Sequence, residues 1–203
     1  MSSESILVLN RATLDAARCI APTPGVLLFK DGEADSFTKL IASEGLFLPR
    51  AAMETDPTYK QIIPYMIFVH QRRLFVMQRS AQAGEQRLAG KYTIGIGGHV
   101  CAEDLDLDGI VGWGMREFEE EVAYNGVIAR ATVFGLVNDD RDAVGQVHLG
   151  VVIILRGESE HIAVRSELIS GFLMDREECF THFDRMETWS QFVVLQLIDK
   201  NVL

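Results

Sequence analysis

The chain lacks any hydrophobic stretch that would cross a membrane. No apolar run approaches the roughly 18 residues that a spanning helix needs, although hydrophobic residues make up 48% of the sequence. The first five residues also lack the basic segment followed by an apolar core that marks a secretory signal. We therefore expect no membrane partner and a cytoplasmic location.

Positive charge is scarce. The 19 lysines and arginines are outnumbered by 29 aspartates and glutamates, which gives a formal net charge of -10. Because nucleic-acid phosphates are held by basic surfaces, this balance argues against binding of a nucleic acid polymer. A small phosphorylated molecule remains compatible with it, since a metal ion bridges phosphate oxygens and protein carboxylates.

Cysteine is scarce as well. The three cysteines, Cys19, Cys101 and Cys179, are an odd number and lack the spacing of a metal site. This pattern predicts reduced thiols rather than a disulfide framework.

The length suits a single domain with additions, because 203 residues bury one substantial core. We assign residues 59–203 to the main domain and residues 1–58 to an N-terminal extension. The extension has apolar runs at 6–9 and 26–29 and a predicted helix around 36–43. We interpret it as an edge extension or a dimerisation element, which is compatible with a homodimer.

The main sheet is predicted to begin at residue 62. Apolar and β-prone residues over 62–69 and 74–78 flank a polar turn, which predicts a hairpin. Two longer strands are predicted over 131–137 and 147–155, and together these segments would form a mixed sheet. His148 in the last of them is interpreted as core or sheet surface.

Other segments of the second half have structural interpretations. The turn at 138–142 is rich in aspartate, which turns favour for backbone reasons, so we interpret it as structural rather than as a metal site. A short strand is predicted over 171–174 and closing helices within 177–197. The apolar stretch 192–195 fits either a helix or a strand.

The most informative segment combines a glycine pair, Gly97-Gly98, with a later acidic helix. Residues three and four apart share a helix face, so Glu117, Glu120 and Glu121 project together while Glu119 points elsewhere. An apolar stripe on roughly the opposite side is predicted to face the core, formed by Val111, Met115, Phe118 and Val122.

Clustered carboxylates on one helix need a compensating charge. Like charges at this spacing cost about 0.2 to 0.5 kcal/mol per pair. Mg²⁺ prefers oxygen ligands and would offset this cost, and Arg116 is placed to orient a neighbouring carboxylate. The alternative interpretation is a solvated helix face, which is what most acidic runs are.

The wider segment resembles the Nudix hydrolase signature, G-x5-E-x7-R-E-U-x-E-E-x-G-U, in which U is a bulky apolar residue. Residues 116–124 match its second half, except that Ala123 replaces the late glycine. The first half is stretched, and the early acid is Asp104 or Glu103, depending on which glycine starts the count. A surface loop tolerates this insertion, since each doubling of its length costs only about 0.6 kcal/mol.

The resemblance implies an α/β Nudix fold, an α/β/α sandwich with a mixed β-sheet between helices. It also implies a hydrolase that uses Mg²⁺ or Mn²⁺ to cleave a phosphoanhydride or phosphoester bond in a nucleoside diphosphate-linked or similar small molecule. Glu120 and Glu121 would be the principal metal ligands, with Glu117 a further ligand or the base that activates water, and Arg116 beside them. The chain near Gly98 would belong to the metal site.

Substrate contacts are predicted from the same resemblance. Gly97 would let the backbone approach the substrate, and Arg79 and Lys91 would meet its phosphates. Many family members place an additional acid downstream, for which this chain offers Glu158, Glu160 and Glu167. The sequence does not choose among these three, and Glu167 is the one we carry forward as a weak candidate.

Two alternatives remain open at this point. Isopentenyl diphosphate isomerase shares the Nudix fold and uses a cysteine and a glutamate, which gives Cys101 a minor claim to catalysis. A noncatalytic Nudix-fold module that binds a nucleotide or metabolite is the second alternative, suggested by the stretched first half of the signature. The complete set of acids in the second half favours the hydrolase.

Overall fold

A mixed β-sheet forms the centre of the computed structural model, which describes residues 4–79, 90–165 and 169–203. Its strands follow the order β12 (Ile169–Met174), β5 (Arg73–Arg79), β4 (Tyr59–His70), β10 (His148–Gly157), β9 (Ile128–Asn138) and β2 (Gly25–Leu28). β4 and β10 are parallel, and the other strand pairs of the described sheet are antiparallel. The predicted hairpin and the predicted mixed sheet are both confirmed.

Shorter strands extend this sheet. β1 (Ser5–Asn10) pairs with β4 and with β3 (Leu46–Pro49), while β6 (Tyr92–Thr93) pairs with β5 and β7 (Gly95–Ile96) pairs with β4. β8 (Val122–Tyr124) and β11 (Ile162–Val164) form a separate two-stranded sheet. The prediction that the sheet begins at residue 62 is wrong. β1 and β2 precede that residue in the sequence, and they join the sheet by pairing with β4 and β9.

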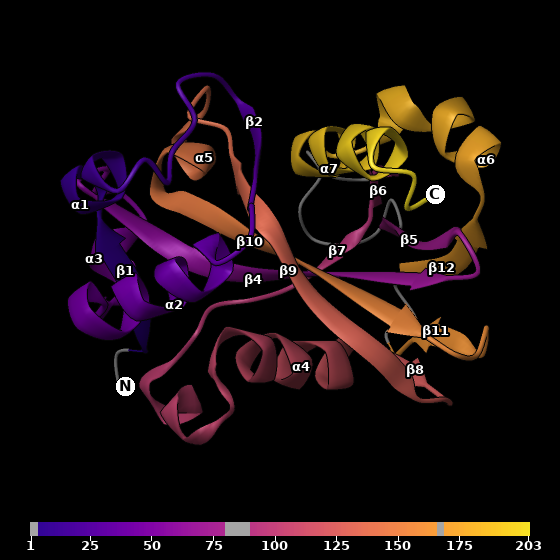
Figure 1. The fold of residues 1–203 in the computed structure, drawn as a ribbon, viewed down its shortest axis with the longest axis horizontal. Coiled ribbons are helices and arrows are strands. Elements are labelled where there is room, and N and C mark those ends of the chain that lie inside the picture. Colours follow the sequence, from indigo (N-terminus) through magenta and orange to yellow (C-terminus); the bar gives the residue numbers. More distant parts are fainter. Residues whose placement is uncertain (1–3, 80–89, 166–168) are drawn as a thin grey trace.

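Helices cover both faces of the sheet (Figure 1). α4 (Gly109–Glu121) and α2 (Glu33–Glu44) pack into one hydrophobic cluster, whereas α7 (Thr188–Asp199) and α6 (Arg176–Thr181) pack into the other. The predicted helix around 36–43 is therefore part of α2, and the ambiguous stretch 192–195 is helical. This is the α/β/α arrangement that the resemblance implied.

The two clusters are separated by the alternation of side chains along the central strands. Ile62, Met66 and Phe68 of β4 point to the α4 side, and Ile67 and Val69 point to the α7 side. Because successive side chains of a strand face opposite ways, β4 is apolar on both faces. Burial on both faces explains why its sequence is almost continuously hydrophobic rather than alternating.

The N-terminal residues also contribute to the core. Leu7, Leu9, Phe37 and Ile41 belong to the cluster that includes α4. They pack there through β1 and α2, so these elements are more than a surface addition. The functional division at residue 58 stays a prediction.

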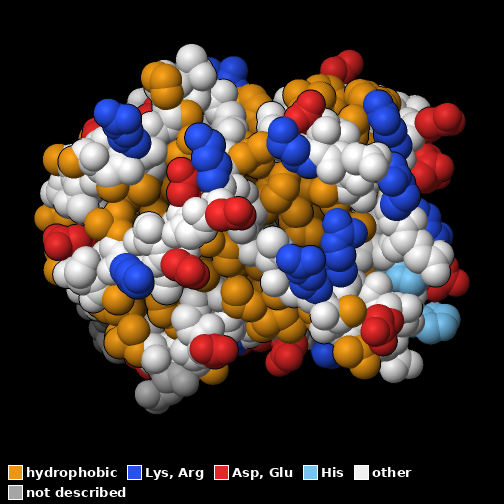
Figure 2. All heavy atoms as spheres, viewed as in Figure 1, with side chains coloured by type: hydrophobic (Ala, Val, Ile, Leu, Met, Phe, Trp, Pro, Cys, Tyr) orange, Lys and Arg blue, Asp and Glu red, His pale blue; other side chains and the backbone are white. Residues whose placement is uncertain are grey.

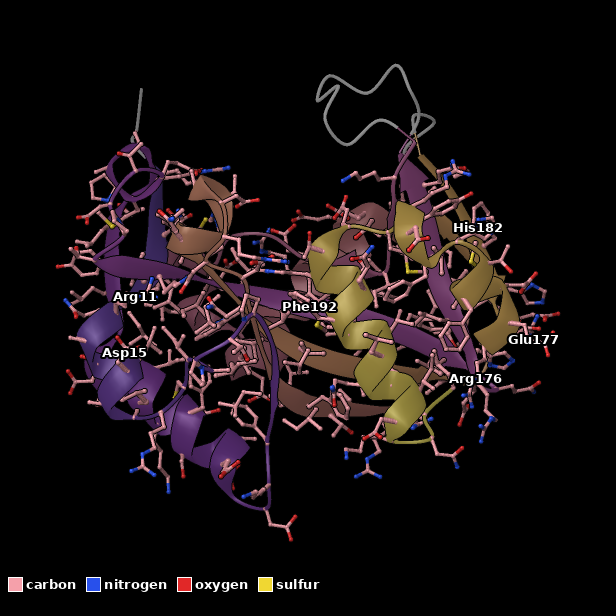
Figure 3. All side chains as sticks on the ribbon, turned by 90° about the horizontal axis from the view of Figure 1, so that it is seen from above. Arg11, Asp15, Arg176, Glu177, His182 and Phe192 are labelled. Atoms are coloured by element: carbon pink, nitrogen blue, oxygen red, sulfur yellow. The ribbon has the colours of Figure 1, made fainter. Side chains whose placement is uncertain are left out.

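The remaining elements are short: α1 (Arg11–Ala16), α3 (Arg50–Met53), α5 (Ala143–Val147) and the 3₁₀ turns Ala102–Asp106 and Phe183–Arg185. Viewed from the α7 side, α1 with Arg11 and α6 with Arg176 lie at opposite ends of the molecule, and α7 with Phe192 crosses between them (Figure 3).

In the described ranges, no helix has the length and apolar character needed to span a bilayer. One face of the molecule carries basic, acidic and apolar side chains in mixture (Figure 2). The net negative charge of the chain is thus not gathered into one acidic surface on that face.

Candidate active site

A cavity of about 920 Å³ brings together parts of the chain that are distant in sequence. The glycine pair and the segment before it line the cavity together with α4 and β4. Further lining residues come from the β9–β10 connection, the start of α7 and the N-terminal segment. Several predicted site residues are among the lining residues: Lys91, Gly97, Gly98, Arg116, Glu117 and Glu121.

The glycine pair passes through a space that admits no side chain. It follows β7, which is hydrogen-bonded to β4. A Cβ atom on Gly97 would lie 2.0 Å from the Pro64 carbonyl oxygen, and one on Gly98 would lie 2.5 Å from the Glu117 carboxylate. The backbone at Gly98 is therefore in close contact with the acidic face of α4, which explains the requirement for glycine here.

α4 is fixed by its apolar side. Ile110, Trp113 and Phe118 are buried, and a Cβ atom on Gly114 would meet the Met66 sulfur at 2.4 Å, which shows how closely the helix approaches β4. The helix ends at Glu121, so Val122, predicted as the last residue of its apolar stripe, is instead the buried first residue of β8.

Arg116 is the centre of the acidic cluster. Its guanidinium lies 2.7 Å from Asp104 Oδ1, 2.7 Å from Glu117 Oε1 and 3.2 Å from Glu120 Oε2. It also donates to the His99 carbonyl oxygen at 3.2 Å. One arginine thus holds three carboxylates and ties α4 to the segment after the glycine pair.

The same contacts distinguish the two candidates for the early acid. The Asp104 side chain is only 7% exposed and is held against Arg116, whereas Glu103 is exposed at the cavity. Asp104 also accepts from the Cys101 backbone N–H at 2.7 Å. When the signature is counted from Gly98, its early acid is Asp104, and this is the acid that contacts Arg116.

Burial controls the protonation of this cluster. Desolvation raises the pKa of Glu117 above its usual range, and the charge of Arg116 opposes that rise. Desolvation acts to lower the pKa of Arg116, but the carboxylates around it outweigh this and raise it. Arg116 remains a cation, while Glu117 binds a proton more readily than an exposed glutamate.

The acids converge on Arg116 rather than on one another. Within the ranges that the structure describes, no three His, Cys, Asp or Glu side chains stand ready as a metal-binding group. Glu117 and Glu121 nevertheless both line the cavity, and the Glu120 side chain is 60% exposed. Carboxylate oxygens of this kind match the donor preference of Mg²⁺ and Mn²⁺.

A buried lysine, Lys60, which was not predicted from the sequence, organises the β9–β10 connection. The Lys60 side chain is 0% exposed, and its ammonium donates to Asn138 Oδ1 at 2.8 Å, Asp140 Oδ1 at 2.5 Å and the Gly145 carbonyl oxygen at 2.7 Å. Burial lowers the pKa of Lys60, and Asp140 opposes the change. Arg11 of α1 is ion-paired with the same Asp140.

The three aspartates of the turn at 138–142 each make a structural contact. Asp140 binds Lys60, Asp139 pairs with Arg141 at 2.8 Å, and Asp142 accepts from the Gly145 backbone N–H as the N-cap of α5. Asp139 and Asp142 also line the cavity. The turn therefore forms part of the site wall through a scaffold of internal contacts.

Two histidines line the cavity, although the sequence did not single out His99 and placed His148 in the core or on the sheet surface. His148 is the partly exposed first residue of β10, which agrees with a position on the sheet surface, and it lines the cavity as well. Cys101 also lines the cavity, but burial and the neighbouring Glu4 raise the pKa of its thiol to about 11. A thiol in this state is a poor nucleophile near neutral pH.

The remaining predicted contacts are Arg79 and the downstream acids. Arg79 ends β5, paired in register with Ile169, and its side chain lies outside what the structure describes, as does Glu167. Glu160, another of the downstream acids, pairs with Arg73 at 2.7 Å.

No protein-family model matches the chain. The chain is 36% identical over 157 residues to Protein YmaB of Bacillus subtilis (strain 168), a match that covers 71% of this chain and 74% of YmaB. Tm1382, a protein described as a candidate Nudix hydrolase, has a similar structure with a TM-score of 0.79 and 27% identity, over 97% of this chain and 99% of Tm1382. The NUDIX domain of Shewanella oneidensis NrtR, solved with ADP ribose, shares the fold with a TM-score of 0.52 and 16% identity, over 86% of this chain and 97% of that domain.

Proposed function

Because the chain belongs to the Nudix hydrolase family, we propose that it is a divalent-metal-dependent hydrolase of phosphorylated small molecules. Its substrate class would be a nucleoside diphosphate-linked or similar compound, cleaved at a phosphoanhydride or phosphoester bond. The observation that carries this proposal is the acidic face of α4, which lies against the glycine pair at a large cavity.

The donor set supports a hard divalent cation. Glu120 and Glu121 would be the principal ligands of Mg²⁺ or Mn²⁺, with Glu117 a further ligand or the base, and the backbone near Gly98 would lie at the edge of the same site. When bound, the metal would neutralise charge on the phosphate oxygens and lower the pKa of water. The three carboxylates around Arg116 carry two more negative charges than that arginine balances, which favours a cation in the cluster.

The protein's own side chains would position the substrate and deprotonate the attacking water. Arg116, anchored by the buried Asp104, holds Glu117 at the cavity and also contacts the more exposed Glu120. Glu117 is the candidate base, because a carboxylate with a raised pKa accepts a proton more effectively near neutral pH. Lys91 at the cavity and Arg79 are candidates for substrate phosphate.

The size of the cavity supports a substrate larger than a simple phosphate. Ligand pockets commonly measure about 300 to 1,000 Å³, and this cavity of about 920 Å³ lies near the upper end of that range. A nucleotide with an attached group would use such a volume. The ADP ribose bound to the NrtR domain is a compound of this class.

A second candidate function is a noncatalytic binding module for the same class of ligand. It is favoured by the engagement of Glu117 and Glu120 with Arg116, which places the acids on an arginine instead of on one another. Isomerisation through Cys101 has less support, since the pKa of its thiol is raised to about 11. Cytoplasmic location and a homodimer remain part of the proposal.

The test is a mass-resolved product assay with a panel of nucleoside triphosphates, nucleotide sugars, dinucleoside polyphosphates and ADP-ribose. Each compound would be incubated with Mg²⁺ or Mn²⁺ and, in parallel, with a chelator. Metal-dependent products would support the hydrolase and identify the scissile bond. If no compound is cleaved while one of them raises the melting temperature, the binding module is the better account.

A further inference from the structure

Two histidine rings lie beside each other in the cavity, outside the proposed metal cluster. The ring centroids of His99 and His148 are 5.7 Å apart, with 53° between the ring planes. His99 follows the glycine pair, whereas His148 is the first residue of β10, so the fold brings them together from distant parts of the sequence. Both rings line the cavity.

The surroundings of His99 fix which nitrogen carries its proton. Gln61 is fully buried, and its Nε2 donates to the Met53 carbonyl oxygen at 3.1 Å. That contact fixes the orientation of the amide, so Gln61 Oε1 is the atom 2.6 Å from His99 Nε2. Because an amide oxygen only accepts, His99 Nε2 must be the donor, which leaves Nδ1 as an acceptor in the neutral ring.

His148 has the complementary arrangement. Its Nδ1 lies 2.7 Å from the Val144 carbonyl oxygen, which only accepts, so Nδ1 is the donor and Nε2 of the neutral ring is the acceptor. In the part of the chain that the structure describes, neither His99 Nδ1 nor His148 Nε2 makes a hydrogen bond. Two neighbouring rings that line the cavity therefore each have one acceptor nitrogen.

Two such acceptors match a group with two adjacent hydrogen-bond donors and repel the oxygens of a phosphate. We propose that His99 and His148 bind the vicinal hydroxyls of the nucleoside ribose of the substrate. The proposal rests on the proposed function, in which the diphosphate lies at the α4 acids. His99 is one residue from Gly98, whose backbone contacts the Glu117 carboxylate. The first group next to the diphosphate in this substrate class is the ribose.

Each acceptor is removable without loss of the hydrogen bond that holds its side chain. In His99→Gln, the glutamine Nε2 replaces the histidine Nε2 as donor to Gln61, and the Nδ1 acceptor is lost. In His148→Asn, the asparagine Nδ2 replaces the histidine Nδ1 as donor to Val144, and the Nε2 acceptor is lost. His161→Asn is the matched control, because His161 is an exposed histidine that is not among the cavity-lining residues.

The experiment measures binding of α,β-methylene-ADP and of its 2′,3′-dideoxy form by calorimetry in Mg²⁺. The methylene group replaces the oxygen that bridges the two phosphorus atoms, so this linkage resists hydrolysis during the measurement. Loss of both hydroxyls should weaken binding to the wild type and to His161→Asn by about tenfold, as two modest hydrogen bonds predict. In His99→Gln and His148→Asn, this discrimination should fall to about threefold.

Equal affinity of the wild type for both compounds would overturn the proposal, as would full discrimination in the two cavity variants or no binding of α,β-methylene-ADP. The panel assay separates this proposal from the proposed function. Discrimination without metal-dependent hydrolysis would keep the ribose site and remove the hydrolase. Hydrolysis without discrimination would remove the ribose site alone.

Discussion

Arg116 and Lys60 each organise part of the cavity wall, but the two cations are satisfied differently. Arg116 has a side chain that is 29% exposed and contacts the carboxylates of Asp104, Glu117 and Glu120. Lys60 is 0% exposed and contacts one carboxylate, Asp140, together with neutral oxygens. The first network has an excess of negative charge, and the second has none.

This difference separates a reactive site from a structural one. A divalent cation would relieve the excess charge around Arg116, and the partial exposure of that network gives the cation access. Lys60 already fills a cage of oxygens in a buried position, where replacement of the ammonium would leave polar groups unsatisfied. We therefore expect changes near Arg116 to affect turnover and changes at Lys60 to affect folding.

The largest effect is expected for Glu117→Gln. Loss of the candidate base should lower kcat by about 10² to 10⁴-fold, the usual contribution of a positioned base, with little change in the melting temperature. Steady-state kinetics on the substrate identified by the panel would measure it. A variant with wild-type kcat would show that another group accepts the proton.

At Lys60 the expected effect is on stability. Lys60→Met should lower the free energy of unfolding by about 3 kcal/mol, because a buried charge network loses its cation. Arg11→Met removes the more exposed partner of the same Asp140 and should cost about 1 kcal/mol or less. Urea unfolding of both variants would test this order, and equal losses would contradict the contrast between the networks.

Asp104 and Glu103 provide a matched pair on the edge of the Arg116 network. Asp104→Asn removes a buried carboxylate from Arg116 and should lower kcat/KM by about tenfold or more. Glu103→Gln should leave it within about twofold, since surface changes away from such contacts have small effects. If Glu103→Gln were the damaging change, the early acid of the signature would be Glu103.

The remaining prediction concerns the pH dependence of stability. His99 has a folded pKa of about 4, below its ordinary value of 6.5. Its neutral form therefore contributes stability that is present above about pH 6.5 and is lost as the pH falls through 4. His99→Gln lacks this contribution, so the difference in unfolding free energy between wild type and variant should shrink from pH 7.5 to pH 4.5. A difference independent of pH would contradict the buried neutral ring.

The sequence predicted those parts of the molecule that depend on short spacing. Glu117, Glu120 and Glu121 lie within one helix, where periodicity decides which side chains share a face, and the hairpin of β4 and β5 is local as well. The end of that helix was less predictable, because Val122 fits either an apolar helix stripe or a buried strand.

The part of the cavity wall formed by the β9–β10 connection depends on contacts between residues that are far apart in the sequence. Lys60 meets Asp140 and Gly145 across 80 and 85 positions of the chain, and His148 reaches His99 only because β10 lies beside β4. A lysine in a predicted strand gives no signal of burial, since its oxygen partners are set by the tertiary fold. The interpretation of Asp104 also required the fold, because the insertion left two counts open.

The most direct test of a metal site on the acidic face of α4 compares metal-dependent turnover in Glu121→Gln and Glu119→Gln. Both changes remove one negative charge from the last turn of α4, but Glu121 lines the cavity, whereas Glu119 is exposed on another face. We predict that Glu121→Gln loses Mg²⁺-dependent turnover by orders of magnitude while Glu119→Gln keeps it. Full turnover in Glu121→Gln would contradict a metal site on this face of the helix.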